Sequence, residues 1–122
     1  MAKKGRYQLA GGLACIGRSD PRYRKFRKQL KATGVSPDET WCLSAQIAVF
    51  LVPRLQEFIK LTTAYPPELG SIQAWRDVLK EMIEGFKLFA AGDDSVGVSD
   101  EADAKMERSL DLLRKWYRYL WW

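Results

Sequence analysis

Cationic side chains dominate the first quarter of the chain, and they are the groups with the clearest chemistry. Residues 1–31 contain ten Lys and Arg residues and a single acid, Asp20, in a chain of 122 residues whose net charge is +5. Ammonium and guanidinium groups at this density bind phosphate oxygens. They predict an anionic partner, such as nucleic acid, a nucleotide or lipid headgroups. The phosphate ligands expected in this segment are Arg22, Arg24, Lys25, Arg27 and Lys28.

The same basic segment has a second interpretation, which needs no other molecule. Residues 32–122 carry ten basic and fourteen acidic side chains, so the rest of the chain is mildly acidic. The basic segment could therefore lie on the acidic body of its own chain or of a neighbouring protomer.

Aromatic side chains crowd the C-terminus and form the second candidate site. Five of the last seven residues are Trp or Tyr, with basic residues between and before them. Flat rings beside cations can stack on nucleobases, but they can equally pack in the core, in an oligomer interface or against a protein partner. We expect Trp116, Tyr119, Trp121 and Trp122 to stack or to form an interface, with Arg114 and Arg118 binding phosphate.

The residues required for common enzyme mechanisms are missing. The chain has no histidine, which excludes imidazole bases and His metal ligands, and it contains no nucleophile elbow, P-loop or dinucleotide-binding glycine motif. Acidic pairs such as Glu81 and Glu84 have basic neighbours and are typical of a solvated helix face. Cys15 and Cys42 are too few for structural zinc and suit a reducing cytoplasm. We expect a protein that is not an enzyme and binds no metal or cofactor.

Helix signals account for nearly all of the chain after a basic, Gly-rich arm over residues 1–18. Ser36 and Glu39 form a capping-box pattern, Ser99 can cap a further helix, and Gly34 can end the first. No strand pair with hairpin chemistry appears. The sequence therefore predicts an all-α bundle, a single domain over 19–122 with helices at about 21–32, 37–63, 71–91 and 99–121.

The longest predicted helix is apolar almost all round, which predicts a central position in the bundle. Pro53 lies within it and should kink or interrupt it. Arg54 follows, and it is either a phosphate ligand in a pocket that the kink opens or an ordinary surface arginine. No apolar run approaches the roughly 20 residues that a membrane span needs. In the last helix we expect the buried stripe to be Met106, Leu110, Leu113, Tyr117 and Leu120.

An ordered set of motifs resembles a family of small phage-encoded proteins of uncharacterised function. The resemblance covers residues 36–122, except that the family has Asp where this chain has Ser44. It implies a viral origin and a binding role, and it carries over no catalytic residue. The motifs are Asp38-Glu-Thr-Trp41-x-Leu43, Pro53-Arg-Leu-x-x-Phe58, Tyr65-Pro66, Trp75-x-x-Val-Leu79-x-x-Met82-Ile83-x-x-Phe86 and Leu110-x-Leu-Leu-x-Lys115-Trp-Tyr-x-x-Leu120-Trp121.

These observations lead to one hypothesis and two alternatives. The first is a phage accessory protein of the host cytoplasm, a homo-oligomer that counters host defence by sequestering a nucleotide-like anionic signal. The second is a nucleic-acid-binding module that uses the basic arm and first helix. The third is an inhibitor that docks on a host defence protein through its aromatic C-terminus.

Overall fold

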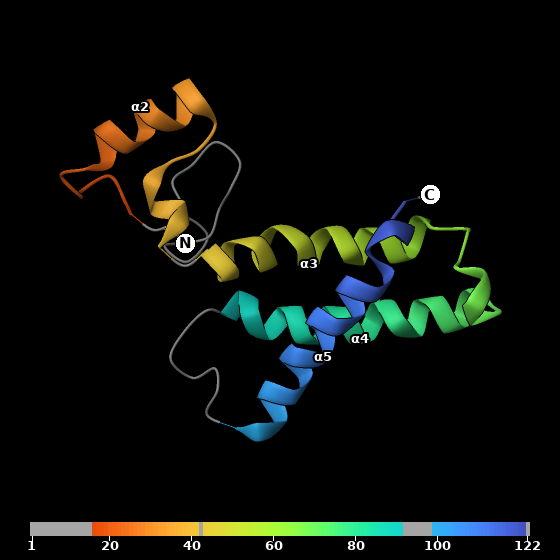
Figure 1. Ribbon diagram of the computed structural model, residues 1–122. Coiled ribbons are helices and arrows are strands. Elements are labelled where there is room, and N and C mark those ends of the chain that lie inside the picture. The colour runs from red at the N-terminus through yellow and green to blue at the C-terminus, as the bar shows by residue number, and fades with distance from the viewer. Residues whose placement is uncertain (1–15, 42, 92–98, 122) are drawn as a thin grey trace. The chain divides into compact units, whose positions relative to one another are not determined.

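The computed structural model describes residues 16–41, 43–91 and 99–121, and in this part of the chain every regular element is helical (Figure 1). The all-α prediction is therefore confirmed for the described residues. Most of the basic arm, residues 1–15, lies outside them. The described residues form four α-helices: α2 (Tyr23–Thr33), α3 (Leu43–Leu61), α4 (Ile72–Ala91) and α5 (Asp100–Trp116). The 3-10 turn η1 (Pro37–Thr40) lies between α2 and α3, η2 (Pro67–Leu69) lies between α3 and α4, and η3 (Tyr117–Tyr119) follows α5.

The chain divides into two compact units at a point inside α3. The N-terminal unit is Met1–Phe50 and the C-terminal unit is Leu51–Trp122. The expectation of a single domain over residues 19–122 stays a prediction.

In the N-terminal unit, α2 ends where the sequence predicted. Gly34 has a φ of 83°, and its N–H donates to the Leu30 carbonyl at 2.8 Å. That left-handed conformation closes the helix and suits glycine because it lacks a Cβ. The helix begins two residues later than Pro21, because Asp20 bonds to Arg22 in the turn that precedes the helix.

The capping box is present, but it starts a 3-10 turn and not the long helix. The Ser36 N–H donates to the Glu39 carboxylate at 2.8 Å, and Pro37 is the first residue of η1. Asp38 is fully buried and accepts from the Ile16 N–H and the Ser36 hydroxyl. These contacts fix the turn at Pro37–Thr40, so the predicted helix start at Pro37 is wrong and α3 starts at Leu43.

Helix α3 passes through Pro53 without a break, so of the two predicted outcomes the interruption is wrong, and the kink stays a prediction. A proline removes one N–H from the helix ladder, and the helix tolerates that loss here. Ala45 and Ala48 are buried, whereas Leu43 and Ile47 are about half exposed. The expectation that this helix is buried all round is therefore also wrong.

The core of the C-terminal unit gathers on one face of α4. Trp75, Leu79, Met82 and Phe86 are all buried, and their 3-4 spacing places them on the same side of the helix. The Trp75 ring meets Phe58 of α3 edge-on, with centroids 6.5 Å apart. The second half of α3 and α4 thus run side by side in opposite directions, and α5 crosses α4 (Figure 1).

Helix α5 is rotated by about one residue from the predicted face. The buried residues are Met106, Ser109, Leu112 and Trp116, whereas Leu110 is 42% exposed and Tyr117 is 69% exposed. The cause is the helix crossing at Gly85, where an added Cβ would collide with Ser109 and with the Lys105 carbonyl. Two small residues let the helices approach closely, which decides the face that α5 buries.

Candidate functional site

A basic hollow lies beside α2 in the N-terminal unit. Its volume is about 590 Å³, and it is open to solvent. Its lining includes Ser19, Asp20, Pro21 and Tyr23, with Asp20 the only acid. Five cationic side chains surround them: Arg18, Arg24, Arg27, Lys28 and Lys31.

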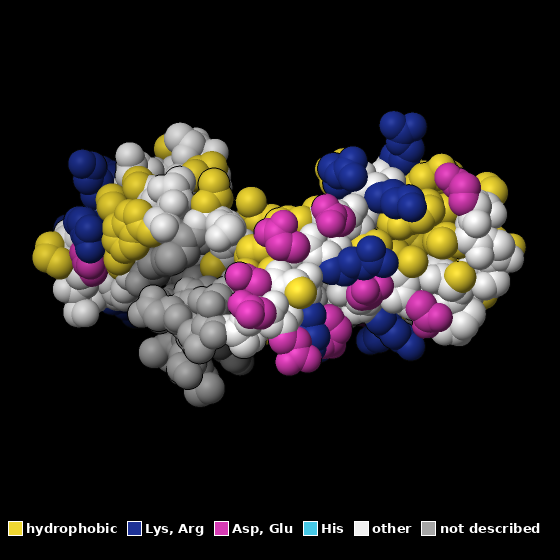
Figure 2. Space-filling view, turned by 60° about the horizontal axis from the view of Figure 1, so that its bottom comes forward, with side chains coloured by type: hydrophobic (Ala, Val, Ile, Leu, Met, Phe, Trp, Pro, Cys, Tyr) yellow, Lys and Arg dark blue, Asp and Glu magenta, His cyan; other side chains and the backbone are white. Residues whose placement is uncertain are grey.

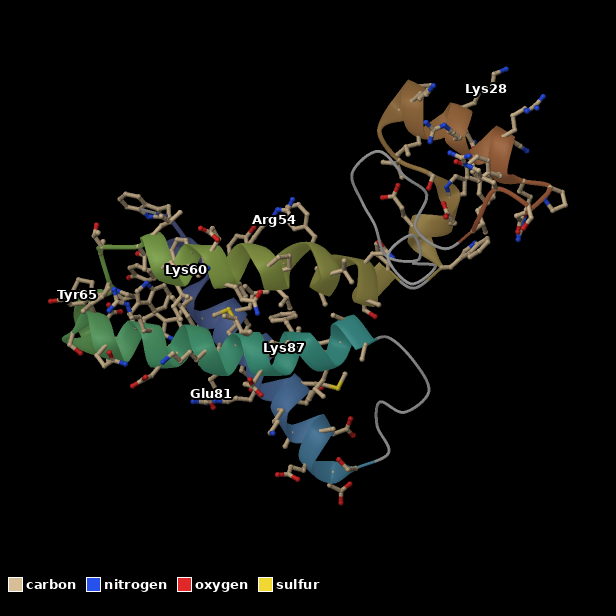
Figure 3. All side chains as sticks on the ribbon, turned by 180° about the vertical axis from the view of Figure 1, so that it is seen from behind. Lys28, Arg54, Lys60, Tyr65, Glu81 and Lys87 are labelled. Atoms are coloured by element: carbon tan, nitrogen blue, oxygen red, sulfur yellow. The ribbon has the colours of Figure 1, made fainter. Side chains whose placement is uncertain are left out.

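Four of these cations share one face of the helix, and we call Arg24, Arg27, Lys28 and Lys31 the basic stripe. Their spacing is i, i+3, i+4, i+7, which places them in line over two turns. At 1.5 Å of rise per residue, the stripe is about 10 Å long. Phe26 is buried away from it and Leu30 is half-buried. Arg24, Lys28 and Lys31 are exposed, whereas Arg27 is half-buried; Figure 3 labels Lys28.

The positive charges of the stripe lower the stability of α2 when no ligand is bound. Like charges at i, i+3 and i, i+4 repel each other by a few tenths of a kcal/mol per pair. The first turn of α2 also contains no acid, and Arg24 and Lys25 lie at the helix end that favours anions. A bound anion would relieve both penalties.

Arg22 was expected to bind phosphate, but its guanidinium is already engaged. Its Nε and Nη2 donate to the two carboxylate oxygens of Asp20 at 3.0 and 2.8 Å. Its Cζ also lies 4.8 Å from the centre of the Trp41 ring. These hydrogen bonds lower the pKa of Asp20 to about 2 and raise that of Arg22. Arg22 thus holds the turn before α2, and its assignment as a phosphate ligand stays a prediction.

The other expected phosphate ligands do not join the stripe. Lys25 is exposed but does not line the hollow. Arg54, Arg114 and Arg118 are exposed residues of the C-terminal unit, and none lines a hollow described here. Figure 3 shows Arg54 on the side of α3 that points away from α4, so it does not line a pocket between these helices.

The aromatic C-terminus separates into core and surface. Trp116 is 5% exposed, and its ring packs on Trp75 with centroids 6.1 Å apart. Lys115 covers it, with Nζ 5.1 Å from the ring centre. Trp116 is therefore a core residue, and the expectation that it could stack on a ligand is wrong.

Two other rings of the expected set do meet at the surface. Tyr119 and Trp121 line an apolar hollow of about 190 Å³ together with Ala64, Tyr65 and Pro67. Trp121 is 70% exposed. No cation lines this hollow, so it lacks the phosphate ligands that nucleotide binding would require. Trp122 lies outside the described residues.

Sequence reasoning missed Arg18 and Lys31 as lining residues, although the i, i+3, i+4, i+7 spacing from Arg24 gives Lys31 directly. It also missed three lysines, Lys60, Lys80 and Lys87, that line a groove of the C-terminal unit. Only the pairing of α3 with α4 brings these lysines together, and no local pattern signals it.

Acidic side chains gather elsewhere, on α5. Asp100, Glu101 and Asp103 lie in its first turn and are exposed (Figure 2). Among the described residues, no group of His, Cys, Asp and Glu side chains could hold a metal ion. No helix in that part of the chain is long and apolar enough to cross a membrane.

Comparison of the chain with protein-family models, curated proteins and solved structures finds no match. The resemblance to phage proteins therefore stays a prediction.

Proposed function

We propose that this protein binds the phosphate backbone of nucleic acid through the basic stripe of α2. The observation that carries the proposal is the line of Arg24, Arg27, Lys28 and Lys31 along one open hollow. Cations in a row on an exposed helix face are suited to a row of phosphates. The binding is sequence-independent, because phosphate contacts carry no base information.

The shape of the hollow favours a polymer over an enclosed small ligand. It is open to solvent and follows the helix for two turns. Phosphates of one strand are spaced by about 3.4 Å along the axis of a duplex, so a stripe of about 10 Å spans about three of them. The acidic start of α5 is repelled by nucleic acid, so the basic stripe should be the contact surface.

Sequestration of a nucleotide-like signal has less support, because two of the residues expected to bind it have contacts within the protein. Arg22 is bonded to Asp20, and Trp116 is buried. Four further expectations stay predictions: interference with host defence, a location in the host cytoplasm, a homo-oligomer, and docking on a host protein through the C-terminus. Light scattering of the purified chain would test the oligomer.

The test is fluorescence anisotropy with a labelled duplex of mixed sequence, repeated between about 50 and 200 mM salt. We expect the logarithm of the affinity to fall linearly with the logarithm of the salt concentration. The double variant Arg24→Gln/Lys28→Gln removes two charges of the stripe at i, i+4. It should lower the affinity and reduce the magnitude of that slope by about 2.

The matched control is Arg114→Gln/Arg118→Gln, which removes the same charge at the same spacing from the C-terminal unit. We expect this variant to bind as the unmodified chain does. Equal losses in both variants would mean that net charge alone attracts the duplex, and no loss in the stripe variant would refute the proposal. A preference for one sequence would contradict backbone recognition.

A further inference from the structure

A second group of cations lies in the C-terminal unit, far from α2 in the sequence. Lys60 of α3 and Lys80 and Lys87 of α4 line a groove of about 510 Å³. The groove is open to solvent, so a ligand would lie along its lining and keep one side exposed. We call it the lysine groove.

The lysines are arranged along the groove in a definite order. Helices α3 and α4 run antiparallel, so Lys60 lies toward the Lys80 end and Lys87 toward the other (Figures 1 and 3). Lys80 and Lys87 are separated by two helical turns, which is about 10 Å along the axis. We call the end opposite Lys87 the Lys60–Lys80 end.

Glu84 lies between Lys80 and Lys87 on the same helix and lines the same groove. In the described part of the chain, none of these three residues makes an ion pair. Lys60 has Glu57 at 3.8 Å, but both side chains are largely exposed, so the pair is weak. The groove thus presents three ammonium groups and one carboxylate to a ligand.

The remaining lining is apolar or neutral. Ile83 is 7% exposed, Ile59 is half-buried beside it, and Gln56 adds one amide. Branched aliphatic side chains provide a dry surface on which a flat ring can lie. The amide can donate to and accept from polar edges of that ring.

This combination selects among anions. Inorganic phosphate satisfies only the lysines and is repelled by Glu84. A fatty acid has a single carboxylate for three lysines, and Glu84 repels it as well. A nucleoside polyphosphate matches every group: its phosphates fit the Lys60–Lys80 end, its sugar hydroxyls or base amino group donate to Glu84, and its base covers the isoleucines.

We infer that the lysine groove binds a nucleoside polyphosphate. The inference does not depend on the proposed function, since the two sites share no residue. It assigns phosphate recognition to Lys60 and Lys80, and recognition of the nucleoside to Glu84.

Isothermal titration calorimetry on the full chain tests the inference with three probes: ATP, inorganic triphosphate and adenosine. We expect one ATP per chain, a triphosphate affinity at least about tenfold lower, and no detectable binding of adenosine. The variant Lys60→Gln/Lys80→Gln should lower the ATP affinity by about tenfold or more. Lys105→Gln/Lys115→Gln, which removes the same charge from α5, should leave it unchanged.

Glu84→Gln provides a readout that charge alone would not give. Removing the carboxylate should raise the affinity for inorganic triphosphate, because a repulsion is lost. The ratio of the ATP affinity to the triphosphate affinity should therefore fall. Equal affinities of the unmodified chain for ATP and triphosphate would overturn the inference. So would the absence of ATP binding, or equal losses in the groove and control variants.

The α2 variant Arg24→Gln/Lys28→Gln separates this inference from the proposed function. We expect it to retain ATP binding while losing nucleic acid. If instead it loses ATP and the groove variant keeps it, ATP binds the basic stripe and the inference is refuted.

Discussion

Single side chains show that a residue's role depends on what it touches. Arg22 and Arg24 are two positions apart and chemically identical. One is held by Asp20 and Trp41, and the other lines an open hollow. The sequence distinguishes them only through Asp20, two residues before Arg22. The guanidinium of Arg22 can form two hydrogen bonds to the Asp20 carboxylate because the chain turns between these residues and the helix.

The first prediction concerns the pH dependence of that pair. The pKa of Asp20 is lowered from 3.8 to about 2, so its stabilisation is complete above pH 3.8 and is lost as the pH falls toward 2. At neutral pH the Asp20→Asn variant should have a lower unfolding temperature than the unmodified chain. The difference between the two unfolding temperatures should disappear as the pH falls from 3.8 to 2. Thermal unfolding followed by circular dichroism measures both. A difference that persists below pH 2 would contradict the pairing.

Gly85 gives the second prediction. A methyl group there would collide with Ser109 and with the Lys105 carbonyl, and the carbonyl belongs to the backbone and cannot rotate away. Overpacking costs about 1–3 kcal/mol, whereas the helix propensity of alanine returns up to about 1. We expect Gly85→Ala to reduce the free energy of unfolding in urea by about 1–2 kcal/mol.

The control for this substitution is Lys87→Ala, at an exposed position of the same helix. It should change the free energy of unfolding by less than about 0.5 kcal/mol. A Gly85→Ala chain as stable as the unmodified one would show that α4 and α5 are not in close contact at this crossing.

At the scale of elements, the sequence predicted helices better than their faces. Ser99 caps α5 through the Ala102 N–H, and Gly34 ends α2, because capping is local chemistry. The buried face of α5 is not local. Counting apolar residues selected Leu110 and Tyr117, whereas close packing at a glycine and a serine turned the helix by about one residue. Hydrophobic periodicity does not register contacts between small residues.

That rotation leads to the third prediction. Leu112 is buried and Leu110 is 42% exposed, although both are leucines on α5. Leu112→Ala should cost about 2–5 kcal/mol, since it leaves a cavity. Leu110→Ala should cost about 1 kcal/mol or less. Chemical denaturation of the two variants measures the difference, and the reverse order would restore the face expected from periodicity.

The two candidate sites also differ in whether residue spacing within one helix predicts them. The basic stripe could be predicted from residue spacing within one helix. The lysine groove could not, since Lys60 and Lys80 meet only after α3 and α4 pair through Phe58 and Trp75. The burial of Trp116 could not be predicted, because composition does not show which ring of an aromatic cluster is buried.

At the scale of the whole molecule, the helices that carry the two candidate sites differ in how many of their residues are buried. In α2, Phe26 is the buried residue, whereas α4 buries six. Apolar burial supplies most of the free energy that resists local opening. The helix that carries the candidate nucleic-acid surface therefore buries fewer of its own residues than α4 does.

Hydrogen exchange of the full chain tests this difference. Amides of Tyr23–Thr33 should exchange faster than those of Ile72–Ala91, because α2 opens at a lower free energy. Added duplex nucleic acid should slow exchange in α2 and leave α4 unchanged, since a ligand stabilises the segment it holds. The same experiment with ATP should instead slow the exposed face of α4. Equal protection of the two helices without ligand would contradict the packing argument, and slowing of α4 by nucleic acid would place the polymer on the lysine groove.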